Sequence, residues 1–143
     1  MIQTADIKSF VLLKYKILTG DFTTWHFCET YPAEVQKSWA WRCAEDVEHL
    51  ATTKESKELY RVARLYSDGL ATKEELTAAY GAGYHSDTGA AHRAAYYAAI
   101  STDGMAASSC AYYAASTNTK KWSIYKSWLI EELCKYEEQQ GTA

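Results

Sequence analysis

The sequence predicts an all-α protein: a compact bundle of six or seven short helices that forms a single domain over residues 1–143. Hydrophobic residues recur at spacings of three and four along most of the chain, which is the periodicity of amphipathic helices. Two capping-box signatures mark helix starts. Proline occurs once, and no long alternation of Val, Ile and Thr indicates a strand.

The first 50 residues of the chain contain two predicted helices. Ile7, Val11, Tyr15 and Leu18 are spaced by four, four and three residues, and Gly20 ends this helix. Residues 21–31 fit either a small helix or a packed loop. Pro32 suits the first turn of the next helix, whose buried stripe is predicted to comprise Trp39, Cys43, Val47 and Leu50.

The two capping boxes pair Thr52 with Glu55 and Thr72 with Glu75, so a helix is expected to start at each. Asp68–Gly69 is expected to end the first of them. The glycines between residues 81 and 89 predict a turn or a distorted helix.

A nearly repeated block follows: Ala94–Ala99 returns sixteen residues later as Cys110–Ala115. We interpret the pair as a helical hairpin in which alanines let the two backbones approach closely. Ala95, Ala98, Ala111 and Ala114 are placed on this seam. Neighbouring residues on a helix point about 100° apart, so one Tyr of each Tyr-Tyr pair can pack inward while the other lies at the rim. A last helix over 120–138 is predicted from a stripe of Trp122, Tyr125, Leu129, Leu133 and Tyr136.

Charge and composition narrow the function classes. The net charge of −3 does not predict nucleic-acid binding, which favours basic patches. No run of about 18 apolar residues predicts a membrane span, and the amino terminus lacks the apolar run of a signal peptide. The four cysteines are scattered, so we expect reduced thiols buried in a cytoplasmic protein.

No catalytic or cofactor motif is present. The histidines have no metal-ligand spacing, and His85 and His92 are expected to lie at the surface or the rim. Glu45 and His49 form an i, i+4 pair that could serve a ligand or enzymatic pocket together with the 81–89 turn. No phosphate-binding loop and no nucleophile elbow accompanies them. We therefore predict no cofactor, no metal and no enzymatic activity.

Two segments resemble a helical family described as putative immunity proteins. The first is Trp39–Leu50, and the second begins at Gly69. The residues that carry the resemblance are Cys43, Ala44, Glu45, Val47, His49, Leu50, Gly69, Ala71, Thr72, Glu74, Glu75, Leu76, Ala78 and Ala79. The similarity covers about residues 39–116. It implies an all-α, non-enzymatic protein of bacteria and their phages that binds and neutralises a partner.

The chain departs from this family pattern where tyrosine replaces alanine and where "STDG" is inserted. The function we predict is steric inhibition of a protein target: a toxin, or a bacterial defence component as for an anti-CRISPR protein. Contact residues are predicted to be Tyr80, Tyr84, His85, Tyr97 and Tyr113. Two alternatives stay open: a structural homo-oligomer built on the Ala/Tyr hairpin, and the pocket near Glu45 and His49.

Overall fold

The computed structural model describes residues 32–83, 89–103, 106–118 and 120–141. Over these ranges it contains six α-helices, one 3₁₀ turn and no strand, which confirms the predicted all-α fold. The elements are α2 (Ala33–Asp46), η2 (Glu48–Leu50), α3 (Lys54–Ser67), α4 (Lys73–Ala82), α5 (Gly89–Ala99), α6 (Ala106–Ala115) and α7 (Lys121–Gly141). The predicted helix around residues 7–18 and Cys28 lie outside the described residues.

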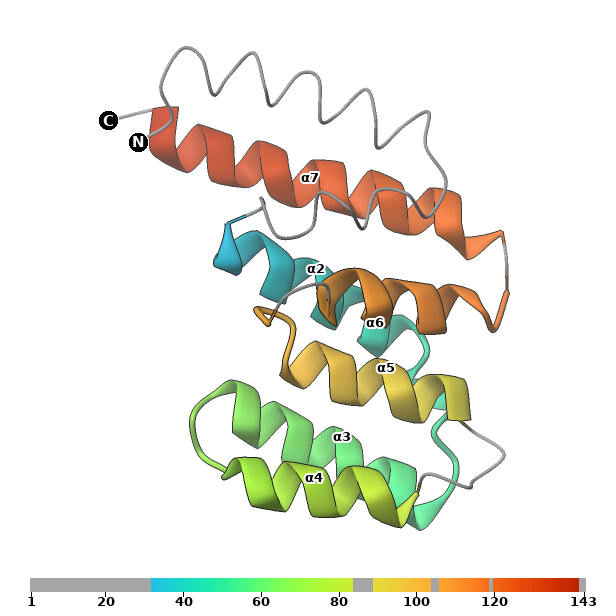
Figure 1. Ribbon diagram of the computed structural model, residues 1–143. Coiled ribbons are helices and arrows are strands. Elements are labelled where there is room, and N and C mark those ends of the chain that lie inside the picture. The colour runs from blue at the N-terminus through green and yellow to red at the C-terminus, as the bar shows by residue number, and fades with distance from the viewer. Residues whose placement is uncertain (1–31, 84–88, 104–105, 119, 142–143) are drawn as a thin grey trace.

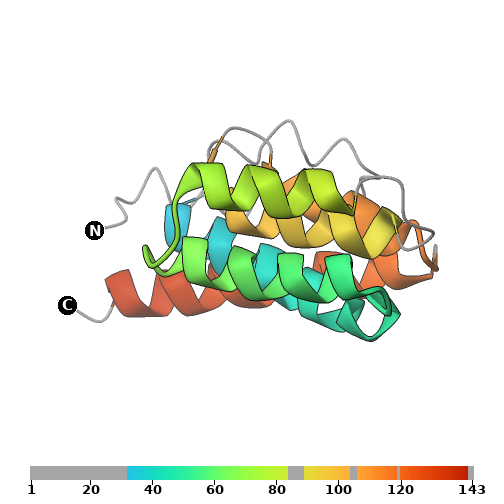
Figure 2. The same cartoon turned by 90° about the horizontal axis from the view of Figure 1, so that it is seen from below.

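The helices are stacked in layers (Figure 1). Helix α7 lies at one end, α2 and α6 form the next layer, and α5 lies between this layer and the α3–α4 pair. Seen from below, α3 and α4 lie side by side in front of the other helices (Figure 2). Helix α2 contacts α5, α6 and α7, so it forms the centre of the stack.

The core of this stack combines small side chains with a few large ones. Trp39 of α2, Tyr60 of α3 and Tyr125 of α7 are at most 1% exposed. Trp39 Nε1 donates a hydrogen bond to Tyr125 O of α7, and Tyr60 Oη donates one to Ala44 O of α2. Both bonds are 2.8 Å long. Tyr125 Oη in turn donates to Asp46 Oδ2. These bonds tie α3 and α7 to α2.

The predicted helix ends are partly correct. The Thr72–Glu75 capping box is confirmed, with both reciprocal hydrogen bonds present. Helix α3 ends as predicted at Asp68–Gly69, where Gly69 has a φ of +77° and Leu70 N donates to Leu65 O. Such an αL residue after the last turn is typical of a Schellman ending.

Two predictions near residue 50 were wrong. The cap of α3 is Thr53, whose hydroxyl accepts from Ser56 N, and not Thr52. Leu50 is 37% exposed and does not continue the buried stripe of Trp39, Cys43 and Val47. The reason is that α2 ends at Asp46 and the chain continues as a 3₁₀ turn, so the helical spacing no longer applies.

We expect the seam between α5 and α6 not to tolerate larger side chains. Ala111 is fully buried, so Ala111→Leu is expected to lower the free energy of unfolding by about 1–3 kcal/mol through overpacking. Ala78→Leu, at an exposed position of α4, is the matched control and is expected to change it by less than about 0.5 kcal/mol. Urea unfolding measures both. Equal midpoints for the two variants would contradict a tightly packed seam.

Burial raises the pKa of the Tyr60 hydroxyl from its ordinary value of 10.0. Because the folded state holds the proton more tightly than the unfolded state, this stabilisation is complete below pH 10 and is lost as the pH rises above it. We expect the melting temperature to fall above about pH 10, and to fall less steeply in Tyr60→Phe. Thermal unfolding from pH 7 to 11, with tyrosinate absorbance, is the measurement; parallel pH profiles would contradict it.

Candidate functional site

The candidate site is a row of aromatic rings that crosses α4, α5 and α6. Tyr97 of α5 and Tyr113 of α6 stack with their centroids 5.4 Å apart and their planes 7° apart. Tyr96 meets Tyr97 edge-on at 75°, and Tyr112 meets Tyr113 edge-on at 82°. We call Tyr80, Tyr96, Tyr97, Tyr113 and Tyr112 the tyrosine row.

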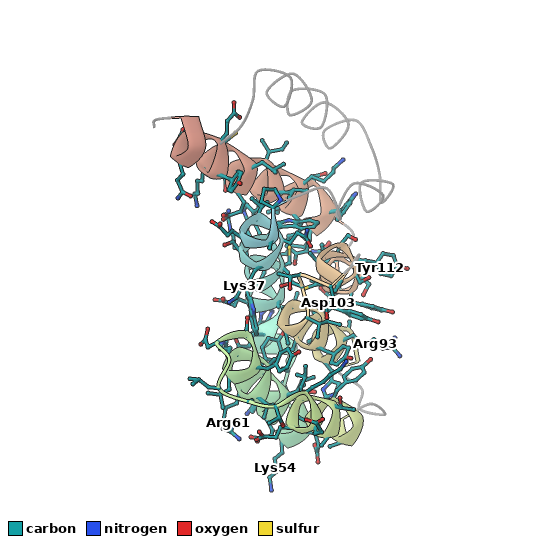
Figure 3. The ribbon with its side chains drawn as sticks, turned by 60° about the vertical axis from the view of Figure 1, so that its left-hand side comes forward. Lys37, Lys54, Arg61, Arg93, Asp103 and Tyr112 are labelled. Atoms are coloured by element: carbon teal, nitrogen blue, oxygen red, sulfur yellow. The ribbon has the colours of Figure 1, made fainter. Side chains whose placement is uncertain are left out.

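The α4 end of the row is closed by Tyr80. Its ring stacks on Tyr96 at 4.1 Å between centroids and also on His92 at 5.4 Å. The α6 end is open to solvent, since Tyr112 is 46% exposed. The Tyr112 side chain points outward on the side of the molecule that also carries Arg93, opposite Lys37 (Figure 3).

The row exists because the seam beneath it is narrow. The predicted seam residues Ala95, Ala98, Ala111 and Ala114 are all fully buried. Cys110 shows how close the backbones lie: its Sγ is 3.2 Å from Ala94 O of α5 and 3.1 Å from Ala40 O of α2. With the backbones this close, rings from α5 and α6 come into direct contact above the seam.

His92 stacks on Tyr80 at the α4 end of the row. Its burial corrects the expectation that this histidine lies at the surface or the rim. It is 1% exposed, and its Nε2 lies 2.7 Å from Tyr80 O while its Nδ1 lies 3.0 Å from Ser56 Oγ. A carbonyl only accepts, so Nε2 carries the proton and Nδ1 accepts from the Ser56 hydroxyl. The pair has the spacing of a nucleophile and its base, but Ser56 is fully buried, so the bond serves to hold α4 and α5 on α3.

Helices α5 and α6, which carry four of the five rings of the tyrosine row, have very little charge. Arg93 is the only Asp, Glu, Lys or Arg in α5 and α6, whereas 23% of the whole chain is charged. Its guanidinium lies over the Tyr113 ring, 5.4 Å from the centroid. The face is therefore aromatic and nearly neutral, with one cation fixed against the row.

The predicted contact residues fall into two groups. Tyr80, Tyr97 and Tyr113 are brought together in the row, but each is half-buried and stacked. Tyr84 and His85 lie outside the described residues. Tyr112, the most exposed ring of the row, was missed, although its position in the repeated block equivalent to Tyr96 was visible in the sequence.

The two residues named for the alternative pocket, Glu45 and His49, do not meet in the described structure. Glu45 and His49 are both exposed and share no hydrogen bond or ion pair. A surface hollow of about 390 Å³ beside η2 and α3 is lined by His49, but Glu45 does not line it. The carboxylate that does line this hollow, Glu48, is paired with Arg64.

The two buried cysteines, Cys43 and Cys110, are not arranged for reactivity. Burial raises the pKa of the Cys43 thiol well above its ordinary value, and the same cause raises that of Cys110. Both therefore stay protonated near neutral pH, and a protonated thiol is a poor nucleophile. Within the ranges that the structure describes, no three His, Cys, Asp or Glu side chains group as metal ligands. None of the helices described is long and apolar enough to span a membrane.

Comparison of the chain with protein-family models, with curated proteins and with solved structures gives no match.

The packing of His92 makes Gly83 a sensitive position. A Cβ added there would lie 2.2 Å from His92 Cε1, whereas one added at Gly81, two residues earlier in α4, meets nothing within 4 Å. We expect Gly83→Ala to destabilise the fold by about 1–3 kcal/mol through overpacking. The matched Gly81→Ala, in the last turn of α4, should stabilise it by about 0.4–1 kcal/mol because alanine restricts the unfolded chain more than glycine does.

Thermal and urea unfolding of the two glycine variants, with near-ultraviolet circular dichroism to report on the tyrosines, test this. A Gly83→Ala protein as stable as Gly81→Ala would show that the His92 ring is not held against α4.

Proposed function

We propose that this chain is a non-enzymatic binding protein that neutralises a protein target by covering part of its surface. The observation that carries the proposal is the tyrosine row on a nearly uncharged helical face. The centres of protein interfaces are enriched in Tyr and Arg and depleted of other charged residues, and the α5–α6 face has this composition.

The stacking within the row favours tight binding. A tyrosine contributes a large contact area and a polar hydroxyl for the cost of fixing two side-chain torsions. In this row each ring is already held by a neighbour, as Tyr97 is by Tyr113. Less side-chain entropy is therefore lost when a partner docks.

The same geometry favours a protein over a nucleic acid as partner. Proteins that bind single strands offer ring faces on which bases stack, next to basic grooves. In the row, the faces of Tyr97 and Tyr113 are turned to each other, and helices α5 and α6 supply one cation, Arg93.

The resemblance to putative immunity proteins supports the same class of function. On that basis we infer that the target is a toxin, or a component of bacterial defence if the protein is made by a phage. A cytoplasmic location suits thiols such as Cys43 and Cys110, because that compartment keeps cysteines reduced. Inhibition by steric occlusion requires one copy per target site and no turnover.

Tyr112→Ala tests the role of the row with little risk to the fold, because the ring is 46% exposed and alanine favours helix. Ile124→Ala is the matched control: its side chain is 42% exposed, on α7. Tagged wild-type protein and both variants are used to capture targets from an extract of the producing cell. The captured protein is then purified, and its affinity for each is measured by calorimetry.

We expect Tyr112→Ala to weaken the Kd by about 30-fold or more, the size of a 2 kcal/mol hot spot, and Ile124→Ala to leave it unchanged. Melting temperatures of the variants control for folding. A target that binds Tyr112→Ala as tightly as wild type would overturn the assignment of the row as the docking surface.

A further inference from the structure

The two halves of the tyrosine row differ because α4 covers one of them. The repeated block puts Tyr96 of α5 and Tyr112 of α6 at equivalent positions, sixteen residues apart. Each meets the tyrosine that follows it edge-on, at a centroid distance of 5.4 Å. Tyr112 is 46% exposed, whereas Tyr96 is half-buried beneath the Tyr80 ring, which stacks on it at 4.1 Å. Helix α4 therefore hides the equivalent of the most exposed ring of the row.

Helix α4 buries less of itself than any other α-helix that the structure describes. Leu76 is its one buried residue among ten, whereas α6, which is equally long, buries seven. Helix α4 also belongs to the α3–α4 pair at the end of the stack opposite α7 (Figure 1). Segments with few buried apolar contacts open at a lower free energy than the core of a protein does. By this criterion, α4 is the easiest of the described helices to detach.

Two tight contacts join α4 to α5 at the carboxyl end of α4. His92 Nε2 donates to Tyr80 O over 2.7 Å, and the Gly83 backbone lies so close to this imidazole that an added Cβ would be 2.2 Å from His92 Cε1. The other ring nitrogen of His92 is bonded to Ser56 of α3, so the imidazole stays anchored when α4 moves away. Water can then replace the Tyr80 carbonyl as the acceptor. Detaching α4 therefore leaves the contact between α3 and α5 in place.

We propose that α4 is an autoinhibitory cover, which detaches from α5 in a local opening while α2, α3, α5 and α6 stay folded. The opening uncovers Tyr96, so that the outer rings of both halves of the row reach the surface. A partner that contacts Tyr96 binds the open form, so its apparent affinity is lowered in proportion to the fraction of molecules that are open. The inference rests on the proposed function in one respect, since it concerns access to the same docking surface. The opening itself requires no partner.

Hydrogen exchange of the wild-type protein at several low urea concentrations tests the opening directly. A helix of ten residues is marginal on its own, so α4 unwinds when it detaches and its amides exchange. We expect these amides, after correction for intrinsic rates, to exchange about 100-fold or more faster than those of α6. Their rates should depend little on urea, because a local opening exposes little surface. If α4 and α6 share one opening free energy and one urea dependence, α4 unfolds only with the whole protein and the proposal is overturned.

Gly83→Ala is designed to favour the open form. Because Ser56 fixes the His92 ring, the added Cβ displaces α4 and not the imidazole. We expect the α4 amides to exchange about fivefold or more faster than in the wild type, which corresponds to the lower end of an overpacking effect. Gly81→Ala is the matched control, since its Cβ meets nothing within 4 Å, and it should not accelerate exchange.

Nitration by tetranitromethane, mapped by peptide mass spectrometry, reports whether Tyr96 is uncovered. We expect its nitration in Gly83→Ala to increase by a factor similar to that of α4 exchange, while nitration of Tyr112 stays as in the wild type. Gly81→Ala should accelerate neither reaction, and circular dichroism verifies that both variants are folded. Faster α4 exchange in Gly83→Ala without faster nitration of Tyr96 would show that α4 does not cover this ring, and would overturn the proposal.

The outcome is separable from that of the proposed function. If α4 opens only with the whole protein but Tyr112→Ala still loses its target, only the cover is wrong. If α4 opens locally and Tyr96 reacts, but Tyr112→Ala keeps its affinity for the target, only the docking surface is wrong.

Discussion

The close packing of α6 against α5 and α2 is the constraint on which the rest of the structure depends. The Cys110 thiol touches a backbone carbonyl of each neighbouring helix, at 3.1 and 3.2 Å. Only small side chains permit such an approach, and those at the contact, such as Ala94 and Ala111, are fully buried. The separation of the two backbones also sets the distance between the tyrosines above them, so one seam determines both the core and the exposed row.

Alanine seams bury little apolar area per residue, so the stack needs other contacts to hold its outer helices. Large, fully buried side chains supply these contacts. Trp39 donates to the backbone of α7 and Tyr60 to the backbone of α2, while His92 joins α5 to both α3 and α4. Buried hydrogen bonds of this kind are costly to leave half-made, so they select one arrangement of helices among the many that interchangeable alanines would allow.

Features that depend on residues close together in the sequence were predicted. Features that depend on contacts between distant residues were missed. The Thr72–Glu75 box and the Gly69 ending involve residues a few positions apart, so the sequence alone identifies them. Thr52 and Thr53 are both suitable N-cap residues for α3. Which of them caps the helix depends on where α2 ends, and in the structure the cap is Thr53. The burial of His92 could not be predicted, because its partners Ser56 and the Tyr80 carbonyl are 36 and 12 residues away. The order of rings in the row likewise required the positions of three helices.

Among the described residues, the potentially reactive groups lie in the core and the aromatic rings lie nearer the surface. The one serine–histidine pair within hydrogen-bonding distance in the described ranges is sealed in the core and satisfied at both ring nitrogens. Burial keeps the thiols of Cys43 and Cys110 protonated. On the face formed by α5 and α6, the surface carries a set of stacked rings and a single cation, Arg93, held against Tyr113. An aromatic and nearly neutral face of this kind has the composition of an interface centre, and this is the basis of the proposed docking function. The seam that allows α5 and α6 to approach this closely therefore also determines the arrangement of the rings above it.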